Sequence, residues 1–406
     1  MDPDAESKHV SEAKDIGDCV LQSIIQIPGA NKLQPCTGES KCVSSIGPLA
    51  PELVSPLISN ERESYEDIKQ EPDKKLPKLL DYSLCLIHLA VFGILGVLTR
   101  YILAKLFGPG GGRVTSDQSI LYLDLPSNMV GSFMMGWFGV VFKADISNVS
   151  EYLTIALTTG YLGSLTTFSG WNQKMLELSV KGDWLFCVLG FLIGLFLVAF
   201  SIIFGIETAK GFRWLLRKLK MSSGSETCRR KKNMKVEGLK HHLVVMVGLL
   251  LILCLFWGIS GVLMDSEFKN GGNSADLWLA CIVGPLGVWI RWLLAQLNGR
   301  GLGATGLLNW VPFGTLIANV SAAFGVAALA TMKKFVNTRN CDIIVTGIQF
   351  GLFGCLSTVS TFAAEFNAMR ESMHTWRAYA YAMITICASF FLGFLIYCIP
   401  IWRMEE

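Results

Sequence analysis

The segment GSLTTFSG, residues 163–170, places four hydroxyl side chains in the middle of an apolar run. Residues 354–361, GCLSTVST, show the same pattern 191 positions later. Ser and Thr side chains can bond the backbone groups that a break in a membrane helix leaves without partners. Small residues also allow tight packing between unbroken helices. On the hydroxyl pattern alone both interpretations stay open.

The separation of 191 residues recurs in two other pairs of segments. These pairs are GILGVLTRY (93–101) with GPLGVWIRW (284–292), and LPSNMVGSF (125–133) with LIANVSAAF (316–324). They align Arg100 with Arg291 and Asn128 with Asn319. An offset that stays constant over three segments without a gap indicates an internal repeat.

The composition places these repeats in a membrane. Hydrophobic residues make up 51% of the 406 residues and charged residues only 17%, against roughly 25% charged in soluble domains. Nine apolar runs approach the ~20 residues that cross a bilayer, at 82–106, 120–142, 152–172, 183–206, 242–263, 277–297, 312–332, 342–365 and 376–402. We therefore expect an all-α membrane protein with two four-helix repeats and one extra helix between them. The 12 Cys are scattered, and we find neither a metal-type cluster nor a nucleophile–base set, so we do not expect an enzyme.

Charge divides the chain and orients it. The expected parts are a disordered tail (1–78), a first repeat (79–206), a basic loop (207–240), a linker helix (241–264) and a second repeat (265–406). The positive-inside rule places the basic loop and the N-terminus in the cytosol and the C-terminus outside. Lys333, Lys334 and Arg339 then fall outside and count against this orientation. The alternative role of the basic loop is to bind nucleic acid or lipid.

The linker helix determines how the second repeat is inserted. Each repeat has an even number of helices, so two repeats joined directly would enter the membrane from the same side. One uniformly apolar helix between them, 242–263, inverts the second repeat. Two inverted units with a site near the membrane midplane are a plan that many transport proteins share.

Taken together, the signature G-x-x-G-x-[LIV]-[ST]-T-[FV]-S, the Asn one helix earlier and the G-x-x-R-[YW] motif resemble the Fluc/FEX (CrcB-like) family of fluoride channels. Bacterial members are four-helix proteins that form antiparallel dimers, and eukaryotic members fuse two units through a linker helix. The resemblance covers residues 82–402. It implies a monomeric chain that exports fluoride across the plasma membrane, with the fluoride ion and the lipid bilayer as partners and no nucleic acid.

The resemblance also implies roles for individual residues. Backbone carbonyls at four positions are expected to hold a structural Na⁺ between the repeats: Gly163, Thr166, Gly354 and Ser357. The positions expected to line the pore are Asn128, Asn319, Phe168, Trp171, Val359, Phe362, Thr167, Ser169, Thr358, Ser360 and Thr361, with Tyr381, Thr385 and Ser389 as a polar track spaced four apart on the ninth helix. Arg100 and Arg291 match an arginine near the vestibule, although both lie near helix ends and could equally extend to the interface.

Fluoride suits this set of side chains. The ion is costly to dehydrate, and Asn N–H and Ser or Thr O–H groups can replace its water, while the positive edge of an aromatic ring also favours an anion. The alternative function is a proton-coupled secondary transporter of small anions. Coupling normally needs an ionisable group inside the membrane, and we find only Asp124 and Glu365 toward span ends and a lone His88. A non-conducting scaffold would not need Asn128 and Asn319 in matched register.

The two repeats differ in ways that predict one working pore and one vestigial pore. The fourth helix, 183–200, has no Ser, Thr or Tyr. If each pore takes one aromatic residue from each repeat, Phe168 with Phe362 forms an intact pair, and Val359 with Trp171 a degraded one.

We expect Phe362→Ile to abolish fluoride efflux from liposomes, because it removes an aromatic edge from the intact pair. Val359→Ile, in the degraded pair, should leave efflux nearly normal. Equal loss in both variants contradicts the assignment.

Overall fold

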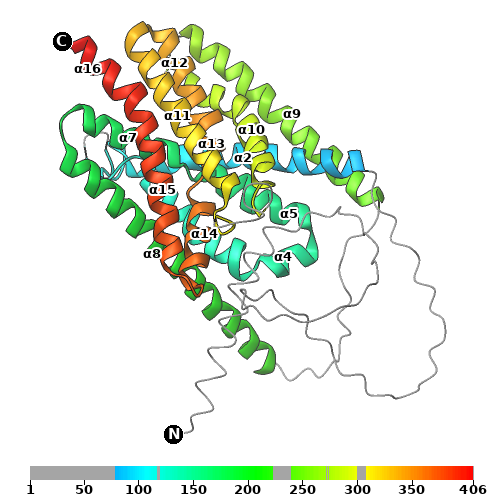
Figure 1. The fold of residues 1–406 in the computed structure, drawn as a ribbon. Coiled ribbons are helices and arrows are strands. Elements are labelled where there is room, and N and C mark those ends of the chain that lie inside the picture. Colours follow the sequence, from blue (N-terminus) through cyan, green and yellow to red (C-terminus); the bar gives the residue numbers. More distant parts are fainter. Residues whose placement is uncertain are drawn as a thin grey trace, which may run out of the picture. The chain divides into compact units, whose positions relative to one another are not determined.

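The computed structural model describes residues 78–116, 119–222, 239–270, 272, 274–299 and 308–405. Apart from Lys78, the predicted tail lies outside the described residues, and so do positions 223–238 of the predicted basic loop. In the described part of the chain, every regular element is a helix (Figure 1).

The helices follow the repeat pattern. The first repeat contains α2 (Lys78–Phe107), α3 (Leu125–Met134), η1 (Met135–Val141), α4 (Lys143–Val149), α5 (Glu151–Ile155), η2 (Ala156–Leu162), α6 (Gly163–Leu165), α7 (Phe168–Val180) and α8 (Trp184–Ser222). The linker helix is α9 (Leu239–Asn270). The second repeat contains α10 (Ala275–Ala295), α11 (Phe313–Val336), α12 (Arg339–Ile348), η4 (Gln349–Phe353), α13 (Gly354–Leu356), α14 (Ser360–Glu371), α15 (Trp376–Gly393), η5 (Phe394–Cys398) and α16 (Ile399–Glu405). The η elements are π-helical stretches.

Seven helices among the described residues are long and apolar enough to cross a membrane, and the bent pair α3–η1 with α4 would make eight. The difference from the nine expected spans arises at the predicted span 152–172. Its helix is interrupted at Thr166 and Thr167, and neither piece reaches the length of a span. The matching region of the second repeat, Arg339–Glu371, is also interrupted but qualifies as one span.

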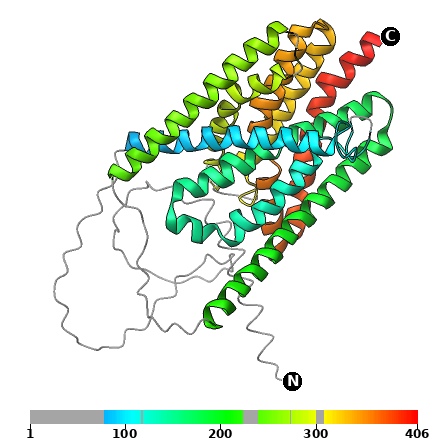
Figure 2. The same cartoon turned by 180° about the vertical axis from the view of Figure 1, so that it is seen from behind.

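The fourth predicted span ends at residue 206, but its helix, α8, continues to Ser222 (Figure 2). After Gly211 this segment contains neither Gly nor Pro and consists mainly of Lys, Arg and Leu, which are good helix formers. Arg213 donates to the Val141 carbonyl and the Asp145 carboxylate, which holds the extension against η1 and α4. The first sixteen residues of the predicted basic loop are therefore helical.

Helices α2 and α10, which are equivalent in the two repeats, pack against each other in antiparallel fashion. The rings of Tyr82 and Trp292 lie 5.3 Å apart, whereas residues near the other end of α2 contact residues nearer the start of α10. The contact is reciprocal. A Cβ built on Gly93 would lie 2.7 Å from Val288 Cγ2, and one on Gly284 would lie 3.4 Å from Val97 Cγ2. These four positions form two pairs related by the 191-residue offset.

Helix α8 and the α15–α16 segment are also antiparallel. Trp184, at the start of α8, lies 6.2 Å from Trp402 in α16, and Phe191 lies 5.7 Å from Phe390 in α15. Figure 1 shows the two segments running in opposite directions. The equivalent helices of the repeats are thus related by an approximate twofold axis.

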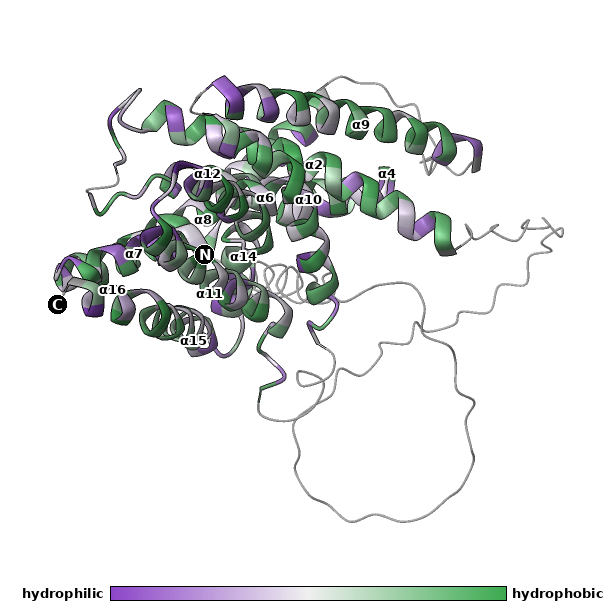
Figure 3. Cartoon of the chain, turned by 90° about the horizontal axis from the view of Figure 1, so that it is seen from above, coloured by the Kyte–Doolittle hydropathy of each residue, from purple (hydrophilic) through white to green (hydrophobic). Residues whose placement is uncertain are grey.

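The linker α9 packs along α2 and α10 and is the least buried of the seven membrane-length helices. Figure 3 shows it at the edge of the bundle, with hydrophobic residues over most of its length. Its exposed side chains include Val244, Leu251, Leu255 and Val262. An apolar surface of this kind suits contact with lipid chains.

Candidate functional site

The two helix breaks meet at the centre of the bundle. Helix α6 ends at Leu165 and α7 begins at Phe168, with the two residues between them in extended conformation. In the second repeat α13 ends at Leu356, and α14 begins at Ser360. The side chains at both breaks are buried. Each break therefore exposes amides and carbonyls that need partners inside the protein.

Each repeat supplies the partners for the break of the other. The Thr166 hydroxyl accepts hydrogen bonds from the backbone amides of Val359 (3.1 Å) and Ser360 (3.0 Å), at the start of α14. The Ser357 hydroxyl accepts from the amides of Phe168 (3.2 Å) and Ser169 (3.1 Å), at the start of α7. These are N-caps supplied across the interface. The 191-residue offset relates each bond to its counterpart.

Four other predicted hydroxyl residues at the breaks, Thr167, Ser169, Thr358 and Ser360, belong to the same network. Ser357 Oγ lies 3.0 Å from Thr167 Oγ1 and 2.9 Å from Ser169 Oγ. In the mirrored arrangement, Thr166 Oγ1 lies 3.2 Å from Thr358 Oγ1 and 3.1 Å from Ser360 Oγ. These side chains join the two repeats at their centre.

The two Asn residues fasten the breaks within their own repeats. Asn128 Oδ1 accepts from the Thr167 amide at 2.8 Å, and its Nδ2 donates to the Thr167 carbonyl at 3.1 Å. Asn319 makes the same two bonds to Thr358, at 2.8 and 3.0 Å. Asn128 Nδ2 donates its second proton to the Tyr122 hydroxyl at 3.1 Å. The sequence-predicted role of these Asn as ligands of the anion thus competes with a structural role.

The predicted vestibule arginines are buried and bond across the repeats. Arg100 is 1% exposed and Arg291 is 4% exposed, so both guanidinium groups lie inside the protein and not on its surface. Arg100 Nη2 donates to the Phe350 carbonyl at 2.5 Å, and Arg291 Nη2 donates to the Thr159 carbonyl at 2.7 Å. Both carbonyls belong to π-helical turns, where the helical bonding pattern is altered.

Two glycines make room for these guanidinium groups. A Cβ on Gly354 would lie 2.3 Å from Arg100 Nη1, and a Cβ on Gly163 would lie 1.6 Å from Arg291 Nη1. No larger residue fits at either position without moving the arginine. The Gly positions that the resemblance assigns to Na⁺ thus also accommodate arginine side chains from the opposite repeat.

The backbone near these glycines meets some, but not all, of the requirements of a cation site. In a continuous helix the carbonyl of residue i accepts from the amide of residue i+4. The amides of Thr167, Phe168 and Ser169 bond side chains instead, so the carbonyls of Gly163, Ser164 and Leu165 lose those donors. The same holds at the second break. Carbonyl oxygens without amide donors are suitable Na⁺ ligands. The positively charged guanidinium groups of Arg100 and Arg291 lie beside them, however, and repel Na⁺.

The predicted aromatic pairs differ in their surroundings. The rings of Phe168 and Phe362 lie 6.2 Å apart, and Phe362 lies 5.2 Å from Tyr381 on α15. Trp171 instead donates from Nε1 to the Gly190 carbonyl at 3.3 Å and packs with Val359 in an apolar cluster. Phe168 belongs to the same cluster and lies 5.8 Å from Trp171, so the two pairs adjoin each other. Each pair also contacts a tyrosine, Tyr381 beside Phe362 and Tyr122 beside Trp171.

The predicted polar track on α15 leads to a carboxylate, Glu365, that sequence reasoning placed toward a span end and did not count among the pore residues. Tyr381, Thr385 and Ser389 are fully buried. The Tyr381 hydroxyl donates to Glu365 Oε2 at 2.7 Å, and the Thr315 hydroxyl donates to Glu365 Oε1 at 2.6 Å. Glu365 is itself 4% exposed. An available indication was the residue 191 positions earlier, Lys174, because a charge reversal between matched buried positions is unusual. Thr361, the remaining predicted pore residue, is half-buried.

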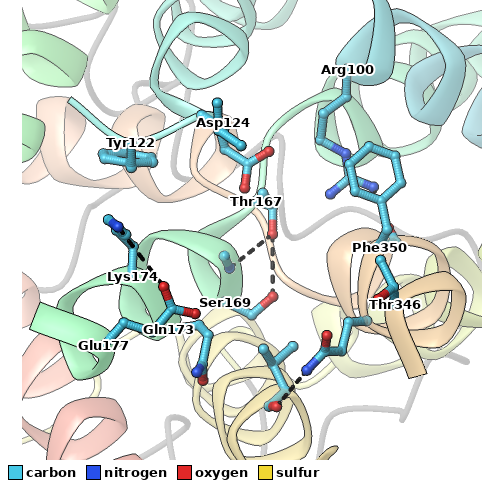
Figure 4. A pocket seen from close by; sticks show the side chains of 14 residues that line it. Arg100, Tyr122, Asp124, Thr167, Ser169, Gln173, Lys174, Glu177, Thr346 and Phe350 are labelled. Carbon is cyan, nitrogen blue, oxygen red and sulfur yellow. Dashed lines mark hydrogen bonds and ion pairs between the residues drawn. The ribbon is translucent and has the colours of Figure 1, made fainter. Parts of the chain in front are cut away.

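A cavity of about 190 Å³ adjoins the first break. Figure 4 shows Thr167 and Ser169 beside it, with Arg100 and Phe350 nearby. Its lining also includes charged side chains of both signs, among them Asp124, Lys174 and Glu177. Both repeats contribute to the lining, so the cavity leads to the junction of the two breaks.

Comparison with known proteins finds one family twice in the chain. The model described as "CrcB-like protein, Camphor Resistance (CrcB)" matches residues 87–206 and 278–397. A "Fluoride-specific ion channel FluC" from Geotalea uraniireducens is 32% identical over 133 residues, which are 32% of this chain and 90% of that protein. Similar proteins of that name occur in Geobacter metallireducens (32% over 127 residues, 31% and 98%) and, as "FluC 2", in Listeria monocytogenes (34% over 119 residues, 28% and 85%). No solved structure gives a significant match.

The caps that each repeat supplies to the other can be tested by substitution. Thr166→Val keeps the shape of the side chain but leaves the Val359 and Ser360 amides without an acceptor. Buried unpaired donors cost roughly 1–3 kcal/mol each, so we expect a clearly lower melting temperature in detergent. Thr158→Val is the matched control, since the Thr158 hydroxyl bonds only the Thr154 carbonyl of its own helix. Equal destabilisation by both substitutions contradicts the capping role.

Proposed function

This chain belongs to the CrcB-like family, and from that membership we propose that it is a fluoride channel that conducts the ion passively across the membrane. The observation that carries the proposal is the double match to the family, because each matched stretch contains one of the two broken helices. The curated relatives are named fluoride-specific ion channels and align over most of their length. One such relative corresponds in length to about one repeat of this chain.

The conducting passage that we propose lies between Phe168 and Phe362 and follows the track of α15. Ring edges and hydroxyl groups there offer positive partial charge without a full charge. Such groups can replace part of the hydration of a small anion, as the lining of a selective pore must. We assign Trp171 and Val359 to a second, vestigial passage, because Val359 offers no ring edge and residues 184–200 of α8 include no Ser, Thr or Tyr.

Glu365 is the observation that favours the alternative, a proton-coupled anion transporter. A buried carboxylate inside a membrane helix could exchange protons. Both of its oxygens, however, accept hydrogen bonds from the hydroxyl groups of Thr315 and Tyr381, which hold the carboxyl group in a fixed position. We therefore assign it to the end of the passage, where it orients the Tyr381 hydroxyl.

We further propose that the repeats are inserted in opposite orientations, with nine spans and with the N-terminus in the cytosol of a plasma-membrane protein. The antiparallel pairing of equivalent helices supports the inversion, since related units in one bilayer can pair this way only if they face opposite sides. The basic residues at the end of α8 support a cytosolic location for that end. The segment 223–238 contains Cys228, and labelling it from each side of the membrane, with the other cysteines replaced, tests the orientation.

A structural Na⁺ at the two breaks also remains a proposal. The carbonyls of Gly163, Thr166, Gly354 and Ser357 would hold it. Its chemistry would be to neutralise carbonyl oxygens that the helix breaks leave without amide donors.

The channel proposal is tested with the purified chain in liposomes. We expect fluoride efflux to follow a membrane potential set with valinomycin and K⁺, and to ignore a pH gradient of either sign at constant potential. A passive pore moves an ion down its own electrochemical gradient and needs no second ion. Uphill fluoride accumulation driven by a proton gradient alone establishes the coupled transporter instead.

Removal of Na⁺ tests the cation. Na⁺ is replaced by N-methyl-D-glucamine at constant ionic strength, in detergent and on both sides of the liposomes. This should lower the melting temperature and slow fluoride efflux, because the carbonyls at both breaks lose the ion that they bind. Unchanged values for both quantities would show that the guanidinium groups suffice without the ion.

A further inference from the structure

Two buried polar groups on facing helices lack partners. Asn172 on α7 and Ser389 on α15 are both 0% exposed. Asn172 Oδ1 and Ser389 Oγ make no hydrogen bond within the protein. Asn172 Nδ2 reaches only the Ser389 carbonyl, at 3.5 Å. A buried polar atom without a partner is costly, which is a reason to expect a bound species here.

The position of this pair matches the proposed passage. Asn172 follows Phe168 by four residues, so both lie on the same face of α7. Ser389 lies two turns beyond Tyr381 on the polar track, after Thr385. The Thr385 hydroxyl already donates to the Tyr381 carbonyl, at 2.8 Å. Among the track residues, Ser389 therefore keeps its proton available.

The other repeat lacks this feature. The positions equivalent to Asn172 and Ser389 are Ala363 and Val198, and both belong to the apolar cluster around Trp171 and Val359. The polar pair therefore has no equivalent in the other half, and it lies on the two helices that carry Phe168 and Tyr381. Packing alone does not require it, because the equivalent apolar pair fills the same place in the related half.

We propose that the Asn172 amide and the Ser389 hydroxyl form an anion-binding point in the passage beyond the Phe168–Phe362 pair. The inference rests on the proposed channel function and adds a residue, Asn172, that the sequence did not indicate. The donors are the Asn172 Nδ2 amide, whose one hydrogen bond is the long contact of 3.5 Å with the Ser389 carbonyl, and the unpaired Ser389 hydroxyl. The Asn172 Oδ1 atom is an acceptor and would have to point away from an anion. A small anion leaving the ring edges would find them on the same wall of the passage, contributed by different repeats.

Fluoride efflux from liposomes at constant potential tests the pair. A hydrogen bond to a charged species is worth roughly 1.5–3 kcal/mol, so we expect Asn172→Ala and Ser389→Ala each to slow efflux by about ten-fold or more. Asn172→Ser, which restores a donor, should recover part of the rate. Asn172→Asp, which presents acceptors when ionised, should be at least as slow as Asn172→Ala.

The matched control is Val198→Ala, at the position equivalent to Ser389, which should conduct like the unmodified chain. Melting temperatures and size-exclusion profiles check that each variant folds. Efflux unchanged in Asn172→Ala and Ser389→Ala, with or without a lower melting temperature, overturns the inference and leaves the pair a structural or water-binding site. Absence of fluoride efflux from the unmodified chain overturns the channel proposal itself, so the two failures are distinguishable.

Discussion

Backbone amides exposed at membrane depth must find an acceptor within the protein, and this requirement governs the arrangement of the whole bundle. In the helices interrupted at Thr166 and Ser357, the first amides after the break have no carbonyl acceptor in the part before it. Each receives its acceptor from the hydroxyl of the opposite repeat. The antiparallel pairing of α2 with α10, and of α8 with α15–α16, brings the breaks together so that these bonds can form. The same arrangement places Arg100 and Arg291 against the glycines of the opposite half.

Equivalent positions of the two repeats carry similar residues in one part of the structure and different residues in another. Positions that hold the halves together are occupied by equivalent residues, as with Arg100 and Arg291. Positions beside the proposed passages differ, and Glu365 stands where the first repeat has Lys174. Interface bonds made in symmetric pairs constrain both halves alike. The lining of each passage is free of that constraint, because the two halves are separate stretches of one chain and can carry different residues.

Much of the fold could be predicted from the sequence, and the misses have physical reasons. The repeat and the apolar linker follow from the sequence. The hydroxyl runs left a helix break and tight packing both open, and the structure has breaks there. The burial of the arginines does not follow from the sequence, because it depends on carbonyls 250 and 132 residues away. Glu365 was placed near a span end because apolarity stops there, but α14 continues to Glu371 within the bundle. Asn172 belongs to no sequence motif, because its proposed role depends on its contact with Ser389 in the other repeat. The hydroxyls of Thr166 and Ser357 bond across the repeats, a fact that no sequence periodicity encodes.

The exchange of caps between halves also bears on how the chain is made. A ribosome completes residues 163–180 well before it reaches residue 357. During that interval the amides of Phe168 and Ser169 lack the acceptor that they have in the finished protein, while their segment is already entering the bilayer. Water, lipid headgroups or the insertion machinery must solvate them until the second half arrives. The nascent first half is therefore an unfinished folding unit, and its exposure to quality control lasts as long as the synthesis of the remaining chain.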